Sequence, residues 1–158
     1  MMAIMGLLNP KSDLLYDPIR KKWVDKTPEE MIRQSLIHEM VENLGYPPTW
    51  IAVEKELSQL PVPAPLPKGQ RIPKRRADLV VFTKNALTGS LRALMMVECK
   101  AVPLTPKFAR QVIGYNAFVG ADFIVLANET QILTGYFDPN AHIYQFEPGL
   151  PRFDALVK

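Results

Sequence analysis

The chain has 158 residues and a formal net charge of +3 at pH 7, and 47% of its residues are hydrophobic and 22% charged. These values are close to the average for globular proteins, so they exclude a largely disordered chain, and the length suits a single compact domain. One cysteine and two histidines exclude an internal disulfide and a zinc site built from these residue types.

The first eight residues are apolar, but no basic segment precedes them, and Asn9-Pro10 interrupts the run too early for a secretory signal or a membrane-spanning helix. We therefore expect a cytoplasmic protein. Residues 9–28 contain three prolines and mixed charges, which predicts an irregular arm. The expected organisation is an N-terminal arm over residues 1–27, one domain over residues 28–146 and a C-terminal tail over residues 147–158.

A first helix is predicted from Pro28 to about Leu44. Thr27 is a typical N-cap, proline is favoured in the first turn, and Glu30 follows the cap at the spacing of a capping box. Apolar residues then recur at helical spacing, and Gly45 predicts the C-terminal cap.

A first strand is predicted over residues 49–57, where apolar residues alternate, although a helical turn could begin at Pro48. Five prolines between Pro61 and Pro73 then exclude regular structure and a tight hairpin. This long connection either borders a substrate groove or serves only as a spacer that covers the edge of the sheet.

An antiparallel hairpin is predicted next. Residues 77–83 are apolar and rich in β-branched types, residues 85–90 carry turn signals, and residues 91–99 form a second apolar run.

The rest of the chain predicts one helix and three strands. Pro106 opens a helix to about residue 119, and a continuous apolar run over residues 121–127 indicates a buried strand. Residues 131–137 and 143–146 are marginal strands at an edge. The order of helix, three strands, helix and further strands predicts a mixed α/β fold.

Two carboxylates and a lysine lie at the ends of the predicted hairpin. Glu98 and Lys100 point to the same face, because side chains alternate along a strand, and antiparallel pairing can bring Asp78 beside Glu98. Two adjacent carboxylates suit Mg²⁺, and Lys100 could then orient or deprotonate a metal-bound water for phosphodiester hydrolysis. The spacing by itself also fits a surface salt bridge, but both carboxylates adjoin apolar strands, which favours a site.

Basic residues gather in two places. Arg20-Lys21-Lys22 is interpreted as a solvated surface. The second group runs directly into Asp78, which makes a polyanionic partner more plausible; its members are Arg71, Lys74, Arg75 and Arg76.

The residues Arg75-Arg76-Ala77-Asp78-Leu79-Val80-Val81, followed by Val97-Glu98-Cys99-Lys100-Ala101, resemble the nuclease core of the PD-(D/E)XK superfamily. More closely, they resemble the N-terminal nuclease-domain family of type I restriction enzyme R subunits. The resemblance extends upstream to residues 17–21 and 27–34 and downstream to residues 111–116, in the order and spacing of the family. It covers about residues 14–137. Two departures are a longer proline-rich stretch and Ala127-Asn128-Glu129 where relatives tend to have Thr-Asn-Gly.

This resemblance implies a restriction-endonuclease-like αβββαβ core, with a mixed central sheet flanked by helices. It implies that Asp78 and Glu98 bind Mg²⁺, for which Mn²⁺ could substitute, and that Lys100 assists catalysis. Glu30 matches a position that adds a water-mediated carboxylate contact, with Glu39 as the alternative, although Glu30 also fits the capping box.

Other matched residues are implied to contact DNA. Gln111 and Tyr115 match the family's Gln-x-x-x-Tyr and are implied to face the site and contact DNA or Lys100. Arg33 and Gln34 match a family pair for which phosphate contact and helix packing both stay open. The implied nucleic-acid-binding residues are Arg33, Gln34, Arg75, Arg76 and Tyr115.

The expected function is that of a Mg²⁺-dependent DNA endonuclease in restriction–modification or DNA repair. A non-catalytic nucleic-acid-binding or scaffold protein with the same fold is the alternative, and a structural domain with surface ion pairs is the third. The 158 residues contain no Walker-type sequence, so any ATP-driven step is expected in another chain, such as a helicase or translocase subunit.

Overall fold

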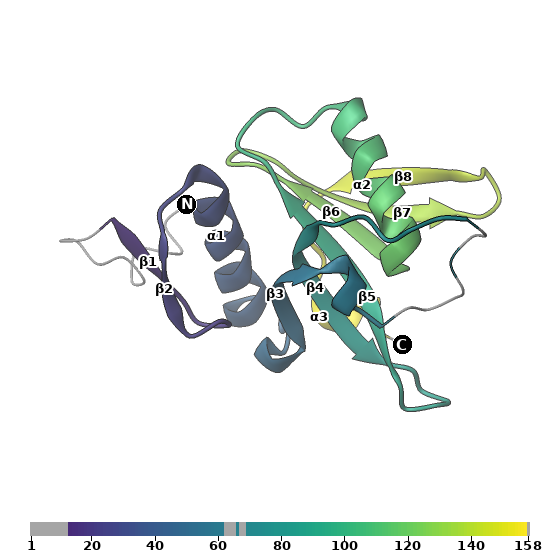
Figure 1. Cartoon of the computed structure of the whole chain (residues 1–158), viewed down its shortest axis with the longest axis horizontal. Helices are drawn as coiled ribbons and strands as arrows, with labels where there is room; N and C mark the ends of the chain where they lie inside the picture. The colour runs from purple at the N-terminus through teal and green to yellow at the C-terminus, as the bar shows by residue number, and fades with distance from the viewer. Residues whose placement is uncertain (1–12, 62–65, 67–68, 158) are drawn as a thin grey trace.

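The computed structural model describes residues 13–61, 66 and 69–157. Six strands form one mixed sheet in the order β3-β4-β5-β6-β7-β8, and two further strands form a separate hairpin (Figure 1). The strands are β1 (Leu14–Asp17), β2 (Lys22–Asp25), β3 (Ile51–Glu56), β4 (Arg76–Lys84), β5 (Leu91–Cys99), β6 (Phe123–Ala127), β7 (Ile132–Asp138) and β8 (Ile143–Pro148). The helices are α1 (Pro28–Glu42), α2 (Pro106–Val119) and α3 (Phe153–Leu156), with single 3-10 turns at Pro48–Trp50 and Leu57–Gln59.

Neighbouring strands of the large sheet are antiparallel except for β5 and β6, which are parallel. A parallel pair needs a crossover connection, and α2 lies in that connection. The predicted restriction-endonuclease-like core is confirmed, because α1, β3, β4, β5, α2 and β6 follow one another in the expected order.

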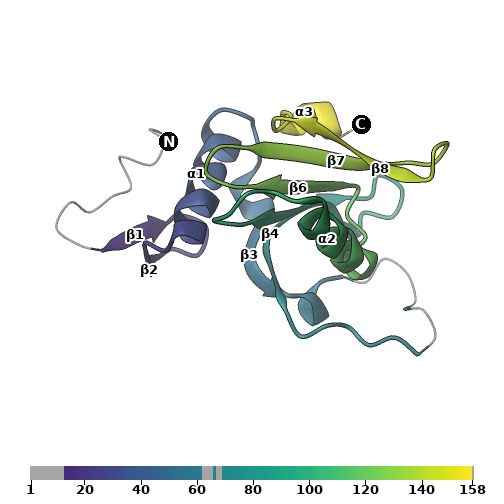
Figure 2. The ribbon, with the colours of Figure 1, turned by 90° about the horizontal axis from the view of Figure 1, so that it is seen from above.

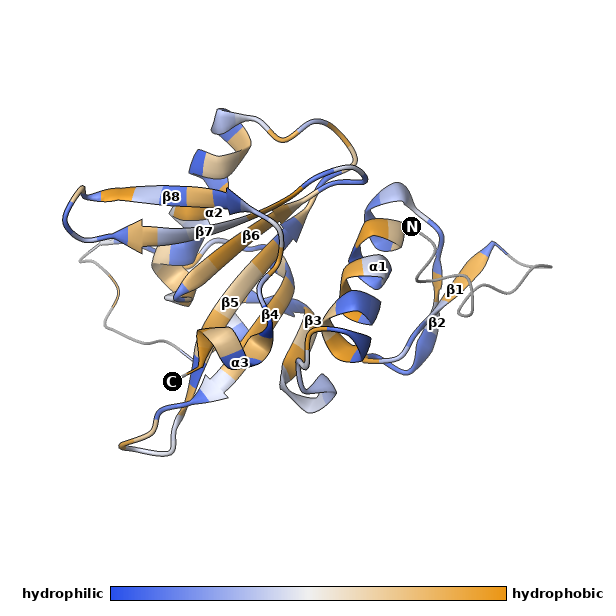
Figure 3. Cartoon of the chain, turned by 180° about the vertical axis from the view of Figure 1, so that it is seen from behind, coloured by the Kyte–Doolittle hydropathy of each residue, from blue (hydrophilic) through white to orange (hydrophobic). Residues whose placement is uncertain are grey.

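Helices cover both faces of the sheet, and each face has its own core. On one face, α1 and α3 cover residues such as Val97 and Val125. On the other, Val112 of α2 packs with Met96 and Ile124. Figure 2 shows α2 and α3 on opposite sides of the sheet. Figure 3 shows that β5 and β6, which are covered on both faces, are largely hydrophobic. Their hydrophobic character explains why the sequence predicted these strands well.

Both long helices begin with a threonine cap, and the cap of the first helix, Thr27, was predicted. The hydroxyl of Thr27 accepts a hydrogen bond of 3.1 Å from the Glu30 N–H, and Thr105 caps α2 in the same way. The first helix ends at Glu42, two residues before the predicted end, and Gly45 adopts the left-handed conformation with a φ of 76°.

The prediction of an irregular arm is wrong for the described part of residues 9–28, because β1 and β2 pair there, with Tyr16 opposite Trp23. Pro18 occupies the turn of this hairpin and breaks no strand. The Asp17 carboxylate accepts hydrogen bonds from the backbone N–H groups of Ile19 and Arg20 at 2.8 and 3.0 Å, which close the turn.

A short third helix lies in the predicted tail, which the sequence did not indicate. The Phe153 N–H donates a hydrogen bond of 2.9 Å to the Leu44 carbonyl, and the Phe153 ring lies 5.4 Å from the Tyr46 ring. Within residues 13–61, 66 and 69–157, no helix is long and apolar enough to span a membrane. Much of the predicted proline-rich connection, at residues 62–65 and 67–68, lies outside the described residues.

Candidate functional site

The two carboxylates predicted to bind metal lie side by side where β4 and β5 stop pairing. The last paired residues at this end are Leu79 and Val97, and the next residue on each strand is Asp78 or Glu98. Beyond this point the Asp78 carboxylate accepts a hydrogen bond of 2.7 Å from the Cys99 backbone N–H. The structure therefore brings Asp78 and Glu98 side by side, as antiparallel pairing predicted.

Glu98 is 3% exposed, and burial together with the nearby Asp78 charge raises the pKa of its carboxyl to about 9. Its Oε1 atom lies 3.1 Å from the Arg75 Nη2 atom, but it has no hydrogen bond within the described part of the chain. The Arg75 guanidinium is thus a positive charge beside this oxygen, which keeps capacity to bind a further cation.

This burial predicts a pH-dependent stability for the metal-free protein. The folded protein holds the Glu98 proton more tightly than the unfolded chain, so the Glu98 contribution is complete below pH 4.5 and is lost as the pH rises towards 9. In EDTA, the free energy of unfolding should fall by about 2–4 kcal/mol more in the wild type than in Glu98→Gln between pH 5 and pH 8. Urea denaturation at both pH values measures this difference. If the difference in unfolding free energy between the wild type and Glu98→Gln did not change with pH, that result would contradict the raised pKa of Glu98.

Arg75 and Tyr115 meet on the α2 side of the site. The Arg75 guanidinium lies 3.7 Å from the centre of the Tyr115 ring, in a cation–π contact. Arg75 also lines a cavity of about 580 Å³ with Lys74 and Arg76. Ile72 and Pro73, at the end of the proline-rich connection, belong to the same lining, which supports the interpretation that this connection borders a basic groove; the remaining lining residues are Glu56 and Ser58.

Arg33 and Gln34 are buried and face the carboxylates from α1. Arg33 Nη2 donates a hydrogen bond of 2.7 Å to Asp78 Oδ1, and Arg33 Nη1 lies 2.5 Å from Glu30 Oε2. Gln34 donates to the other oxygen of Glu30 at 3.0 Å. With Arg33 4% exposed and Gln34 fully buried, these contacts support helix packing over a phosphate contact.

The Glu30 carboxylate has a different role from the capping box. The capping box would bring this carboxylate to the Thr27 backbone N–H, but that N–H donates to the Asp25 carbonyl at 2.9 Å. Arginine side chains and Gln34 occupy both Glu30 oxygens instead. The alternative residue, Glu39, accepts a hydrogen bond from Asn43 and lines a separate cavity.

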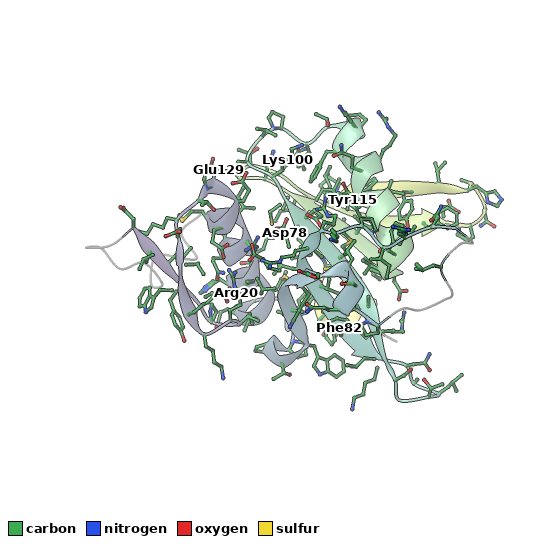
Figure 4. All side chains as sticks on the ribbon, in the orientation of Figure 1. Arg20, Asp78, Phe82, Lys100, Tyr115 and Glu129 are labelled. Carbon is green, nitrogen blue, oxygen red and sulfur yellow. The ribbon has the colours of Figure 1, made fainter. Side chains whose placement is uncertain are left out.

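Two residues of this cluster were not predicted. Arg20 pairs with Asp17 and Glu30, and its Nη1 atom lies 3.1 Å from Glu54 Oε2. Glu54 also lies 3.2 Å from Arg33. Figure 4 shows Asp78 between α1 and the sheet, with Arg20 on the side of the hairpin and Lys100 and Tyr115 on the side of α2.

Arg20 lies in the matched segment 17–21, but the resemblance implied no role for it, and Glu54 carried no signal in the sequence. Arg20 belongs to a basic run interpreted as solvated, but its side chain is only 15% exposed. Glu54 has a φ of 53° and interrupts the pairing between β3 and β4, in which Val53 faces Leu79 and Lys55 faces Ala77. The register is the same on both sides of Glu54, and strand alternation does not anticipate a left-handed residue at this position.

The other predicted residues lie around this centre with looser contacts. Lys100 follows β5 directly, and its Nζ atom lies 4.7 Å from the centre of the Phe108 ring. It forms no ion pair with Asp78 or Glu98 within residues 13–61, 66 and 69–157. Gln111 is exposed and has no hydrogen bond there, and Arg76 is an exposed residue 4.0 Å from Glu56.

The donor set suits a hard divalent cation. Asp78 and Glu98 offer carboxylate oxygens, and Mg²⁺ typically binds one or two carboxylates while keeping several waters and substrate phosphate oxygens. No group of three or more His, Cys, Asp or Glu residues that could hold a metal ion occurs in the described part of the chain. Water and substrate would therefore complete the coordination.

The comparisons with known proteins give one match. A family model described as type I restriction enzyme R protein N terminus (HSDR_N) matches residues 28–151, well over half of the chain. No curated protein and no solved structure gave a match. The matched residues include α1, the Asp78–Glu98 pair, α2 and all six strands of the large sheet.

Proposed function

The chain belongs to the type I restriction enzyme R protein N-terminus family, and on that premise we propose that it is a Mg²⁺-dependent DNA nuclease domain acting in restriction–modification. The observation that carries the proposal is the Asp78–Glu98 pair, in which Glu98 is buried and one of its oxygens has no hydrogen bond within the described residues. A divalent cation would add positive charge beside this pair, and a DNA phosphate would supply further oxygen ligands to that cation. Cytoplasmic location and assembly with helicase or translocase subunits are part of the same proposal.

Each residue of the candidate site has a distinct role in this proposal. Asp78 and Glu98 would hold the cation, which when bound polarises the scissile phosphate and lowers the pKa of its water. Asp78 is oriented by Arg33 and the Cys99 N–H before any substrate arrives. Lys100, at the end of the same strand, would accept the proton of the attacking water or hold that water at its Nζ atom.

Basic residues on the α2 side would bind the DNA backbone. Arg75 lies between Glu98 and the basic cavity, so its guanidinium can exchange the carboxylate for a phosphate oxygen. The Tyr115 ring contacts the guanidinium and would hold it in place. Lys74 and Arg76 line the same cavity and would add contacts that do not depend on sequence.

Cleavage of plasmid and linear DNA tests this function. With Mg²⁺ or Mn²⁺ the protein should convert supercoiled plasmid to open or linear forms, and EDTA should stop the reaction. A gel-shift measurement in Ca²⁺ separates binding from cleavage. Binding without cleavage under either metal would replace the enzyme with the non-catalytic binding alternative, and the absence of both binding and metal uptake would leave a structural domain.

A further inference from the structure

The β1–β2 hairpin reaches the candidate metal site through one side chain. The Asp17 carboxylate, fully buried, holds both the backbone and the guanidinium of Arg20. From this position Arg20 extends to Glu30 on α1 and to Glu54 on β3. The hairpin, α1 and β3 therefore meet at Arg20.

Arg33 forms the second half of this connection. It pairs with Glu30, with Glu54 and with Asp78, and its side chain is 5% exposed. Burial alone would lower the pKa of its guanidinium, but the neighbouring carboxylates outweigh burial and raise that pKa. Arg33 therefore stays charged and cannot turn away from Asp78 without breaking other ion pairs.

The two oxygens of Asp78 are fixed from opposite sides. Oδ1 accepts from Arg33 at 2.7 Å and Oδ2 accepts from the Cys99 N–H at 2.7 Å. A carboxylate has about four lone-pair sites, so each oxygen keeps capacity for a cation while its orientation is set.

The network as a whole carries excess negative charge. Four carboxylates (Asp17, Glu30, Glu54 and Asp78) and two guanidinium groups (Arg20 and Arg33) take part, which gives −4 plus +2, or −2. If Arg20 left, Arg33 alone would face three carboxylates of this set (Glu30, Glu54 and Asp78), and they would compete for its donors. Asp78 would then lose its fixed partner.

We propose that Arg20, Glu54 and Arg33 are positioning residues that orient Asp78 for a divalent cation, and that they couple cation binding to docking of the β1–β2 hairpin. This proposal rests on the proposed function, since it takes Asp78 as a cation ligand. Because such coupling is reciprocal, the docked hairpin strengthens cation binding and the cation strengthens hairpin docking by the same factor.

Calorimetric titration with Mn²⁺ tests the first direction. Arg20→Gln should weaken Mn²⁺ binding about 10-fold, within the usual range of coupling energies. The sign is diagnostic, because the loss of a nearby positive charge would by simple Coulomb attraction tighten binding of a cation. Arg20→Lys should bind with intermediate affinity, since an ammonium retains the charge but not the planar fork that reaches several carboxylates.

The control variant is Arg92→Gln. Arg92 forms an ion pair with Asp122 at 2.6 Å, and both side chains are about 40% exposed. This variant removes the same charge and should bind Mn²⁺ as the wild type does. Circular dichroism and thermal unfolding of each variant establish that it is folded. Mn²⁺ affinity of folded Arg20→Gln equal to or tighter than that of the wild type would overturn the proposal.

Amide hydrogen exchange tests the reverse direction. Saturating Mn²⁺ should slow exchange in residues 14–25 of the wild type and should have a smaller effect in Arg20→Gln, with the β7–β8 pair as an internal reference. Unchanged exchange in the hairpin while Mn²⁺ binds would overturn the coupling and leave the nuclease proposal intact. A wild type that binds no Mn²⁺ would overturn the coupling and the metal dependence together.

Discussion

Asp78→Asn is expected to lower the rate of Mg²⁺-dependent DNA cleavage by about 1,000-fold, which corresponds to about 4 kcal/mol of transition-state stabilisation. An asparagine has nearly the same shape and its carbonyl oxygen can still accept from Arg33 or the Cys99 N–H. It loses the negative charge that a hard cation requires as a ligand. Single-turnover cleavage at saturating enzyme measures the rate of the chemical step.

The matched control is Asp122→Asn, an exposed carboxylate in a surface pair with Arg92, which should cleave at the wild-type rate. DNA binding in Ca²⁺ by Asp78→Asn should stay within a few-fold of the wild type, because the basic cavity lies on the α2 side. Cleavage by Asp78→Asn at the wild-type rate would remove this residue from the site and with it the basis of the nuclease proposal.

Periodicity allowed the sequence to place the carboxylate pair. The strands that became β4 and β5 are apolar on both faces, so their existence and antiparallel pairing were readable, and the register then set Asp78 against Glu98. The order of the matched motifs along the chain supported a functional site more strongly than the spacing of Glu98 and Lys100 did, because an acidic residue two positions before a lysine is common on exposed strands. The burial of Glu98, which changes its chemistry most, could be seen only in three dimensions.

The part of the site formed by Arg20 and Glu54 could not be predicted from the sequence in the same way. Arg20 looked like part of a solvated basic run, because a run of three cations gives no sign of which one turns inward. Arg20 turns inward because it meets Glu30 on α1 and Glu54 on β3, and the left-handed Glu54 lies within the pairing of β3 with β4. These are contacts between different elements of the fold, which local patterns do not encode.

Arg33→Ala is expected to destabilise the metal-free protein by about 3–5 kcal/mol, because removing one partner of a buried ion network leaves uncompensated charges. Glu30 and Asp78 would lose their main cationic partner on α1. The free energy of unfolding from urea denaturation in EDTA measures the loss. Arg92→Ala, at an exposed pair, should change it by less than about 1 kcal/mol.

The pH dependence of the unfolding free energy of Arg33→Ala separates an effect of charge from an effect of lost packing. In Arg33→Ala the Asp78 carboxylate loses its guanidinium partner, whereas Glu30 and Glu54 keep Arg20. Because acid reduces the negative charge left uncompensated, the difference in unfolding free energy from the wild type should narrow as the pH falls from 7 towards 4.5. A gap caused only by a missing side chain would stay constant over this range. Arg33 also orients Asp78. A difference in unfolding free energy that narrows with acid would therefore show that charge balance within the protein holds Asp78 in place. A difference that stays constant would contradict the role of the ion network in holding Asp78.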